Sequence, residues 1–274
     1  MIHSPRMFRV AGQLLRYRGL LATLTSRELK ARYRGSVLGF LWSLANPLLL
    51  LAVYTFVFNV VFQPRASGVE PYALFVVSGL FPWIWVSTST LEGSMSLIAN
   101  SGLIRKAVFP AELLPTVAVL SNMVHLLFAI PIVAVALLAG RVLGFQNVGG
   151  LSAFLLPAIF LLHLPMVAGL ALGAGALTVH FKDVRDLLAN LLTLFFFLTP
   201  ILYPLDSVAH LPAVWWLVRL NPFTPFTLAY QQTLFYGVVP DATLWIQMAL
   251  VSLFFWALGA GLFERLRETL VEAA

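Results

Sequence analysis

The 274-residue sequence contains no cysteine and few charged residues. The absence of cysteine excludes disulfide bonds and thiolate chemistry. Charged residues make up 10% of the chain, whereas soluble domains carry about 25%. With 60% hydrophobic residues and 22 phenylalanines, the chain has too little polar surface for a water-soluble globule. The composition therefore predicts a polytopic membrane protein with aromatic residues at the membrane interfaces.

Several motifs of catalysis and ligand binding are also missing. The chain has no G-x-x-x-x-G-K-[ST] sequence, so we expect no phosphate-binding loop of its own. It has no H-E-x-x-H sequence and no other spacing typical of metal ligands, so no metal site is expected. The N-terminal sequence MIHSPRMFRVAGQLLRYRG lacks the apolar core and the cleavage site of a signal peptide. We therefore expect the first membrane span to stay in the mature protein.

Six long apolar runs divide the chain. A transmembrane helix needs about 20 mainly apolar residues. The runs cover residues 36–62, 72–99, 113–140, 151–179, 187–205 and 244–263. The sequence therefore predicts an all-α integral membrane fold with six transmembrane helices.

The orientation follows from the distribution of lysine and arginine. Cytoplasmic segments carry an excess of both residues. With the N-terminus inside, 14 of the 17 basic residues fall in inside segments and only Arg65, Arg141 and Arg219 fall outside. This asymmetry predicts that both termini are cytoplasmic.

The stretch 206–243 does not fit either a loop or a span. It is apolar, but Pro212, Pro222, Pro225 and Pro240 divide it, and proline ends or kinks helices. A seventh span here would place Arg265 and Arg267 outside, against the charge distribution. We therefore expect two short re-entrant helices that enter the outer leaflet and return, which is possible where protein or water covers the backbone.

The cytoplasmic arm (residues 1–35) precedes the membrane domain (36–263), and a short cytoplasmic tail (264–274) follows it. Thr25 and Glu28 match the S/T-x-x-E capping box, which predicts a helix start. Charged and apolar residues alternate along this segment, as in an amphipathic helix lying in the cytoplasmic interface. The charged residues are Arg27, Glu28, Lys30, Arg32 and Arg34.

Three ionisable residues lie within the predicted spans. Glu92 either borders a polar channel or pairs with a cytoplasmic arginine, since intramembrane acids usually find a partner. His125 and His163 either form a proton relay or are neutral rings hydrogen-bonded between helices. A lone glutamate does not supply the two or more converging groups that a membrane transferase or protease needs.

Small and aromatic residues suggest packing roles. Gly169, Gly173 and Gly175 have the small-residue spacing of close helix–helix contacts. Phenylalanines 195–197 cannot all point one way on a helix, so at least one should face lipid.

Asn46-Pro47 lies within the first span, where proline permits a kink. Our hypothesis is that this kink passes motion from the arm into the channel.

The loop NSGLIRKAVFPAELLP between the second and third spans is short and basic. It should expose Leu103, Ile104, Val108 and Phe109 on the cytoplasmic side, which is typical of a protein-contact surface. The alternative is a helix end that folds back against the bilayer.

Four segments together resemble the membrane subunits of ABC type-2 polysaccharide exporters. They are RELKARYRGSVLGFLWSLANPLL, LIRKAVFPAELLP, HFKDVRDL followed by TPILYP, and LNPFTPF, in the order and spacing of that family. The resemblance covers nearly the whole chain. It implies a permease that exports a lipid-linked polysaccharide across the bacterial inner membrane, with O-antigen first and capsular polysaccharide or teichoic acid next.

The resemblance also implies partners. The family works as a homodimer docked to two copies of a cytoplasmic ABC ATPase, which would bind ATP and magnesium, so this chain itself would need no cofactor. No nucleic-acid partner is expected. The chain itself is expected to be a transport subunit and not an enzyme.

Site residues follow from the same resemblance. The interface helix would span about 20–35, a coupling helix about 100–110, and outer-leaflet gate helices about 208–238. The implied coupling residues are Leu103, Ile104, Arg105, Lys106, Phe109 and Pro110. The implied gate residues are Asn221, Pro222 and Phe223. The candidate channel-lining aromatics, from the first and fifth spans, are Trp42, Tyr54, Phe58, Phe196 and Tyr203.

Two other functions stay open. One is an ABC type-2 exporter of a drug or small lipid, which would differ in the width and aromatic lining of its channel. The other is a membrane-embedded transferase acting on a lipid-linked sugar, which would work without ATP and would depend on Glu92.

Overall fold

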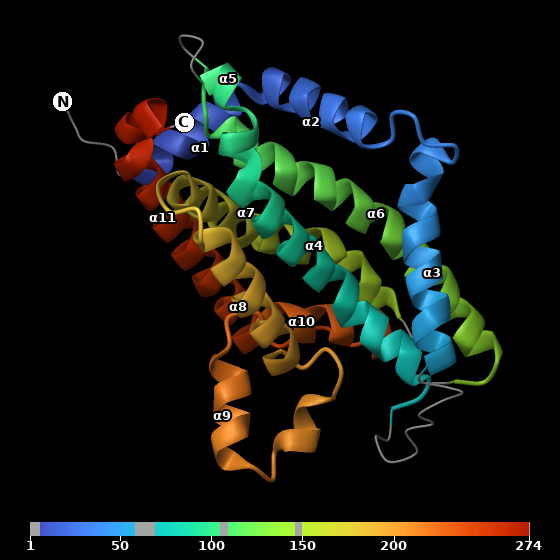
Figure 1. The fold of residues 1–274 in the computed structure, drawn as a ribbon. Helices are drawn as coiled ribbons and strands as arrows, with labels where there is room; N and C mark the ends of the chain where they lie inside the picture. Colours follow the sequence, from blue (N-terminus) through green and yellow to red (C-terminus); the bar gives the residue numbers. More distant parts are fainter. Residues whose placement is uncertain (1–5, 58–68, 105–108, 146–149, 274) are drawn as a thin grey trace.

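The computed structural model describes residues 6–57, 69–104, 109–145 and 150–273, and within these ranges the secondary structure is helical, without strands. Figure 1 shows the arrangement of the helices. The α-helices are α1 (Arg6–Arg16), α2 (Arg18–Arg32), α3 (Trp42–Phe56), α4 (Tyr72–Ala99), α5 (Ser101–Ile104), α6 (Leu113–Val142), α7 (Leu156–His180), α8 (Val184–Leu198), α9 (Pro212–Leu220), α10 (Thr224–Tyr230) and α11 (Ala242–Ala273). Short 3-10 segments lie at Gly39–Leu41, Leu151–Leu155 and Leu205–Val208, and a π-helical segment at Gln231–Phe235.

Four helical segments of the described chain are long and apolar enough to cross a membrane. They are Tyr72–Ala99, Leu113–Val142, Leu151–His180 and Ala242–Arg267, close to four of the predicted spans. Helices α3 and α8 have 15 residues each, or roughly 22 Å at 1.5 Å per residue. That is shorter than the hydrocarbon core of about 30 Å. The all-helical membrane class is confirmed, whereas the six-span count is not.

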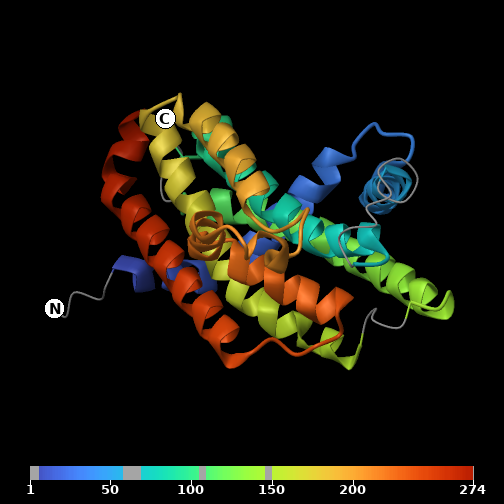
Figure 2. The same cartoon turned by 90° about the horizontal axis from the view of Figure 1, so that it is seen from below.

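Helices α4 and α7 form the centre of the bundle. Helix α4 packs against α6 and α7, and α7 packs against α11 along its length. Viewed from below, α11 and α3 lie on opposite sides of this pair (Figure 2). Helix α3 contacts α4 and α6, while α8 contacts α4 and α7. The main hydrophobic core includes the fully buried side chains of Phe75, Trp85 and Tyr230.

Glycines allow α7 and α11 to approach closely. A Cβ atom at Gly169 would overlap the backbone of Phe255, and one at Gly259 would overlap the carbonyl oxygen of Gly169. On the side of α7 that faces α4, a Cβ atom added at Gly175 would lie 3.0 Å from the Gly93 carbonyl oxygen. Small residues let helix backbones approach in membranes. The predicted packing role of the glycines is confirmed.

The arm differs from the prediction in its helix start. Helix α2 begins at Arg18, and Thr25 lies inside it with its hydroxyl donating to the Leu21 carbonyl oxygen at 2.8 Å. The capping-box interpretation was therefore wrong. The helix already begins upstream at Arg18, so the N–H groups that follow Thr25 bond to carbonyl oxygens of the preceding turn and need no hydrogen bond from the Thr25 hydroxyl oxygen. Along α2, Leu21, Leu24 and Leu29 are half-buried, whereas Arg27 and Lys30 are exposed.

The arm does not continue as one helix into the first span. Gly35 and Gly39 have positive φ angles of 78° and 50°, which favour glycine and end the helical path. Helix α3 then starts at Trp42, six residues after the predicted start of the span at 36. The chain thus turns a corner between α2 and α3 (Figure 1).

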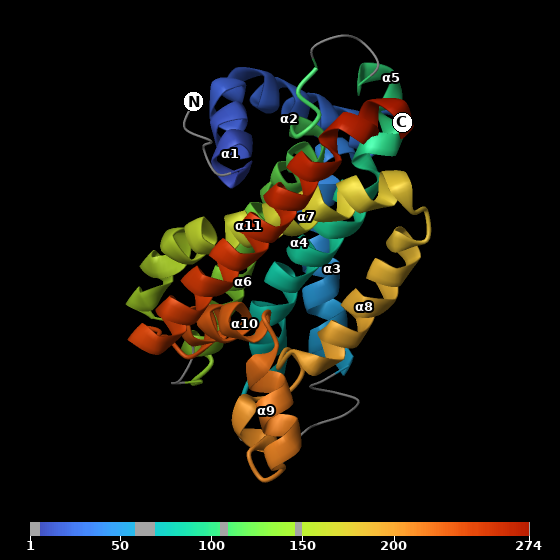
Figure 3. The ribbon, with the colours of Figure 1, turned by 90° about the vertical axis from the view of Figure 1, so that its left-hand side faces the viewer.

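The two ends of the bundle differ in what they carry. Helices α1, α2 and α5 and the C-terminal part of α11 gather at one end, and α9 lies at the other (Figures 1 and 3). Two short helices, α9 and α10, lie within 206–243, and α10 packs against α4, α7 and α11. Their entry into the outer leaflet stays a prediction. Helix α11 continues through the predicted tail to Ala273.

Candidate functional site

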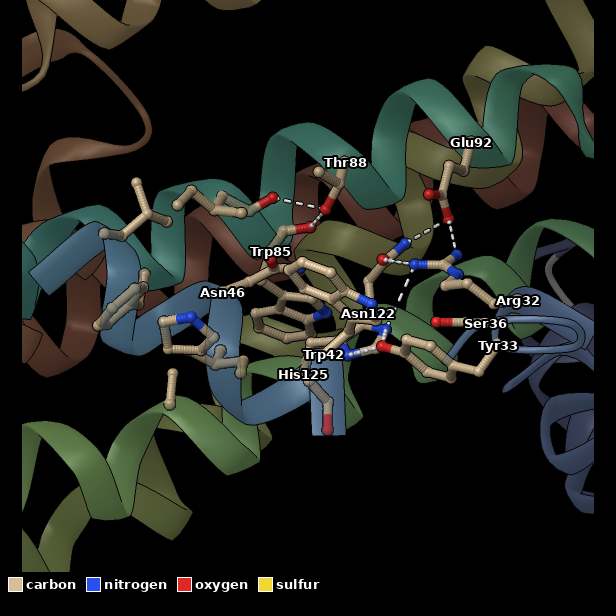
Figure 4. A pocket seen from close by; sticks show the side chains of 17 residues that line it. Arg32, Tyr33, Ser36, Trp42, Asn46, Trp85, Thr88, Glu92, Asn122 and His125 are labelled. Carbon is tan, nitrogen blue, oxygen red and sulfur yellow. Dashed lines mark hydrogen bonds and ion pairs between the residues drawn. The ribbon is translucent and has the colours of Figure 1, made fainter. Parts of the chain in front are cut away.

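A cavity of about 500 Å³ opens where the arm meets the bundle (Figure 4). Helices α3, α4 and α6 form its walls, and the end of α2 borders it. Its labelled lining residues are Arg32, Tyr33, Ser36, Trp42, Asn46, Trp85, Thr88, Glu92, Asn122 and His125. Ligand pockets commonly measure about 300–1,000 Å³, with a few convergent polar groups among aromatic ones. This cavity has that size and that composition.

Arg32 is the centre of the polar network in the cavity. Its guanidinium donates to the Glu92 carboxylate at 2.7 Å and to the Asn122 side-chain oxygen at 3.0 Å. The Asn122 amide in turn donates to the same Glu92 oxygen at 2.6 Å. The network therefore joins α2 to α4 and α6 through three side chains.

Glu92 pairs with an arginine, as one of its two predicted readings requires, and it also lines the cavity. The Arg32 side chain is 28% exposed and that of Glu92 is 42% exposed, so water screens the pair. Its net contribution to stability is about 1 kcal/mol or less. The hydrogen bonds of a planar guanidinium with two acceptors add direction, which holds α2 at a defined place on the bundle.

His125 completes this side of the cavity. Its ring lies 3.3 Å from the Arg32 guanidinium, and its Nδ1 atom lies 3.2 Å from the Tyr33 hydroxyl. Burial raises the pKa of Tyr33 more than the charge of Arg32 lowers it, so its hydroxyl remains protonated at neutral pH. These contacts agree with the second prediction for His125, a ring that is hydrogen-bonded between helices.

His163 lies in different surroundings. Its ring stacks on Phe226 with centroids 4.1 Å apart, and its Nδ1 atom lies 3.3 Å from the Tyr230 hydroxyl. His163 is buried in the main core, whereas His125 lines the cavity. The described contacts give the two histidines separate partners and do not support a proton relay between them.

Aromatic side chains form the other walls of the cavity. Trp85 is buried and donates from its indole N–H to the Val119 carbonyl oxygen at 3.1 Å, so its ring is fixed. Trp42 is 37% exposed and faces the same space. Asn46 and Pro47 also line the cavity, and Pro47 cannot donate to the carbonyl one turn earlier. The predicted kink position therefore borders the site.

The predicted coupling residues form part of a second hydrophobic cluster. Ile104 is buried, and Leu103 and Phe109 are half-buried against a group that includes Val10, Leu97 and Phe263. The expectation that Ile104 is exposed on the loop was wrong, because its side chain turns inward onto this cluster. Pro110 is also buried. Arg105, Lys106 and Val108 lie outside the described residues.

An ionic cluster beside this loop escaped the sequence analysis. Glu112 is fully buried at the start of α6, and its carboxylate lies 3.9 Å from the Arg267 guanidinium. Arg267 also pairs with Glu264 at 3.3 Å, and Glu264 pairs with Arg9 at 3.4 Å. The cluster joins α1, α11 and the base of the loop. The only signal in the sequence was an acid two residues after Pro110.

The other interface-helix residues point to solvent. Arg27, Glu28, Lys30 and Arg34 are exposed, and only Arg32 of the predicted set enters the network. This division places four charged groups on a surface that another molecule can reach.

The candidate channel aromatics do not gather in one place. Trp42 lines the cavity, and Tyr54 is half-buried against the main core. The ring of Phe196 lies 6.1 Å from that of Trp83, and the Tyr203 hydroxyl donates to the Phe197 carbonyl oxygen at 3.3 Å. Phe58 lies outside the described residues. Phe197 is 61% exposed, as expected for at least one member of the triplet.

The predicted gate residues form the turn between α9 and α10. The buried Asn221 amide donates to the Thr199 hydroxyl at 2.8 Å, which ties this turn to the end of α8. The Asn221 side-chain oxygen accepts from the Phe223 N–H at 3.0 Å. Phe223 is buried against Trp83 and Phe195, while Pro222 is half-buried. Asn221 and Phe223 are therefore structural anchors of the turn.

The geometry of the site is suited to binding a ligand, because polar groups and aromatic rings line the same cavity. The Glu92 carboxylate accepts hydrogen bonds from the Arg32 guanidinium and the Asn122 amide. Within the described residues, no group of three or more His, Cys, Asp or Glu side chains is placed to hold a metal ion. The polar and aromatic walls can receive hydroxyl and ring groups of a ligand.

Comparison with known proteins gives consistent matches over most of the chain. Residues 19–235 match the family model described as ABC-2 type transporter. The chain is 36% identical over 267 residues to the O-antigen export system permease protein RfbA of Myxococcus xanthus, covering 97% of this chain and all of that protein. It is 32% identical to the RfbA permease of Klebsiella pneumoniae over 80% of this chain and 82% of that protein.

A more distant relative carries a different substrate in its name. The polysialic acid transport protein KpsM of Escherichia coli is 20% identical over 89% of this chain and 92% of that protein. The long family match and the near-complete alignment with RfbA agree with the apolar helical bundle. The chain therefore belongs to the ABC-2 type transporter family, as a membrane-embedded permease subunit.

Proposed function

We propose that this chain is the permease subunit of an ATP-driven exporter that carries a lipid-linked surface polysaccharide, an O-antigen first of all, across the bacterial inner membrane. The alignment with RfbA supports it, because it covers 97% of this chain and all of that protein. ATP hydrolysis belongs to a separate ATPase, since the chain has no phosphate-binding loop. Capsular polysaccharide, the class to which polysialic acid belongs, is the nearest alternative cargo.

The ATPase would bind at the end of the bundle that carries α1, α2 and α5 (Figures 1 and 3). Fourteen of the 17 basic residues belong to the segments assigned to this side, as in cytoplasmic segments generally. A force on α5 reaches α4, α7 and α11 through Ile104 and its cluster. A force on α2 reaches α4 and α6 through Arg32. Two routes thus lead from the docking end into the bundle.

The path for the polymer would form between two copies of the chain. Helices α3 and α8 present exposed apolar side chains, including Leu49 and Val53 on α3 and Leu194 and Phe197 on α8. In a membrane such faces contact lipid or a second subunit. A homodimer that brings these helices together would provide an aromatic and aliphatic wall along which a sugar chain can slide, with the charges of α8 confined to Arg185 and Asp186 in its first turn.

Export in cells tests the proposal. A strain lacking the permease gene should accumulate polymer inside and should regain surface polymer when this chain is supplied with its ATPase. A Walker-lysine variant of the ATPase is the control and should block recovery. If the purified chain alone transferred sugar without ATP, it would be a transferase. If the complex exported only small lipids or drugs and surface polymer stayed absent, the cargo assignment would be wrong.

A further inference from the structure

A second cavity lies at the opposite end of the bundle from the Arg32 network. It measures about 480 Å³ and is bounded by the start of α4, the 3-10 segment Leu205–Val208, helices α9 and α10, the π-helical segment and the start of α11. Figures 1 and 3 show these elements around α9, away from α1 and α2. Eight of its sixteen lining residues are polar or charged, with tyrosine counted as hydrophobic. This is unusual for a chain in which 60% of residues are hydrophobic.

Several polar groups of this outer cavity can still form hydrogen bonds with a ligand. The side chains of Asp206, Asp241 and Gln247 line the cavity and belong to residues in the exposed class. No ion pair of the described residues includes Asp206, Arg219 or Asp241, although all three line the cavity. Carboxylates accept hydrogen bonds and a guanidinium donates them. A cavity with open carboxylates and a guanidinium that no carboxylate pairs with is therefore suited to a ligand that supplies both donors and acceptors.

Several of these groups are held in place. The Gln231 amide donates to the Pro200 carbonyl oxygen at 2.9 Å, and Asp241 accepts the Leu244 N–H at 2.9 Å. The Arg219 guanidinium lies 4.2 Å from the centre of the Trp215 ring. Groups that are fixed before binding lose little conformational freedom when a ligand arrives. The cavity is therefore preorganised.

The charges discriminate between the possible ligands. Asp206 and Asp241 carry two negative charges against one positive charge on Arg219, so the net field disfavours a phosphate or pyrophosphate. Neutral sugar hydroxyls can donate to carboxylates and amide oxygens and accept from a guanidinium. Tyr236 adds an aromatic ring, 38% exposed, at the same cavity, against which the apolar face of a sugar can pack.

We propose that this outer cavity is a saccharide-binding site that holds sugar units of the exported polymer as they leave the membrane. The inference rests on the proposed function, because that function names the class of cargo. In this proposal, α9 and α10 form the turn that contains Asn221 and Phe223, and they also contribute side chains that bind the glycan. The site would act on released or emerging sugar residues and would not need the lipid carrier.

Binding to the purified full-length chain in lipid nanodiscs, without the ATPase, tests the site. The probes are short oligosaccharides released by mild acid from the surface polysaccharide of the organism that carries the chain. Saturation-transfer NMR and tryptophan emission report binding. Asp206→Ala and Gln247→Leu remove exposed hydrogen-bonding groups without disturbing the core, and the double variant should bind at least tenfold more weakly than the parent chain.

Matched controls lie at the other end of the molecule. Asp186→Ala and Gln13→Leu make the same chemical changes away from the cavity and should leave binding unchanged. Equal binding by the parent chain and the double variant, or no binding by the parent, would overturn the site. Displacement of the probe by inorganic pyrophosphate would make it an anion site instead. If the parent chain still exports polymer in cells in those cases, the proposed function stands without the site.

Discussion

At the residue scale, Arg32 and Glu92 show how one pair can connect an arm to a bundle. Glu92→Gln should keep at least half of the parent export, because the glutamine oxygen can still accept from Arg32 and Asn122. Surface polymer in cells measures this. Glu92→Arg is the disruptive counterpart, since two adjacent cations repel each other, and it should abolish export. A complete loss with Glu92→Gln would show that the charge itself is used, as a transferase would require.

The contact between α7 and α11 depends on glycine at single positions. Gly259→Ala forces a methyl group into the backbone of Gly169 and should destabilise the protein by about 2 kcal/mol. Gly261→Ala is the matched control, because an added Cβ there meets no atom within 4 Å. Alanine in a helix interior is more favourable than glycine by roughly 0.5–1 kcal/mol, so this variant should be neutral or stabilised. The midpoint of thermal inactivation in detergent compares the two, and equal midpoints would contradict the close-packing argument.

Individual residues were only partly predictable from the sequence. The glycine spacing indicated close packing, because small side chains at that spacing have few other uses in a membrane helix. Glu92 could be recognised as needing a partner, but its partner lies 60 residues away and only the fold brings them together. Asn122 carried no local signal, and Glu112 had only its place two residues after Pro110, since a buried ion pair or amide depends on which helices meet.

At the element scale, ion pairs connect Glu112, just before α6, with α11 and α1. Within the described chain, Arg267 is the only cation within 4 Å of the buried Glu112 carboxylate. Arg267→Ala should therefore leave an uncompensated buried acid and cost roughly 2 kcal/mol of stability. Adding Glu112→Gln to that variant should restore most of the loss. Thermal unfolding of the four proteins in the cycle measures the coupling, and strictly additive effects would show that the pair does not interact.

Element boundaries were predictable where the apolar pattern was long. The span predicted at 72–99 coincides with α4, because a continuous apolar run of that length has no alternative in a membrane. The start of α3 was missed by six residues, since the turn at Gly35 and Gly39 depends on positive φ angles that an apolar run does not reveal. Thr25 misled for a similar reason, because the capping-box pattern does not tell a helix start from a mid-helix hydroxyl.

At the scale of the whole molecule, the ends of the bundle should lie on opposite sides of the membrane. Because the chain has no cysteine, a single introduced cysteine reports its own location without background. Ala209→Cys, exposed just before α9, should react with a membrane-impermeant maleimide in intact spheroplasts. Ala31→Cys, exposed on α2, should react only after the membrane is opened. The basic arm favours the cytoplasm, so labelling of Ala31→Cys in sealed spheroplasts would reverse the orientation and with it the side on which the ATPase docks.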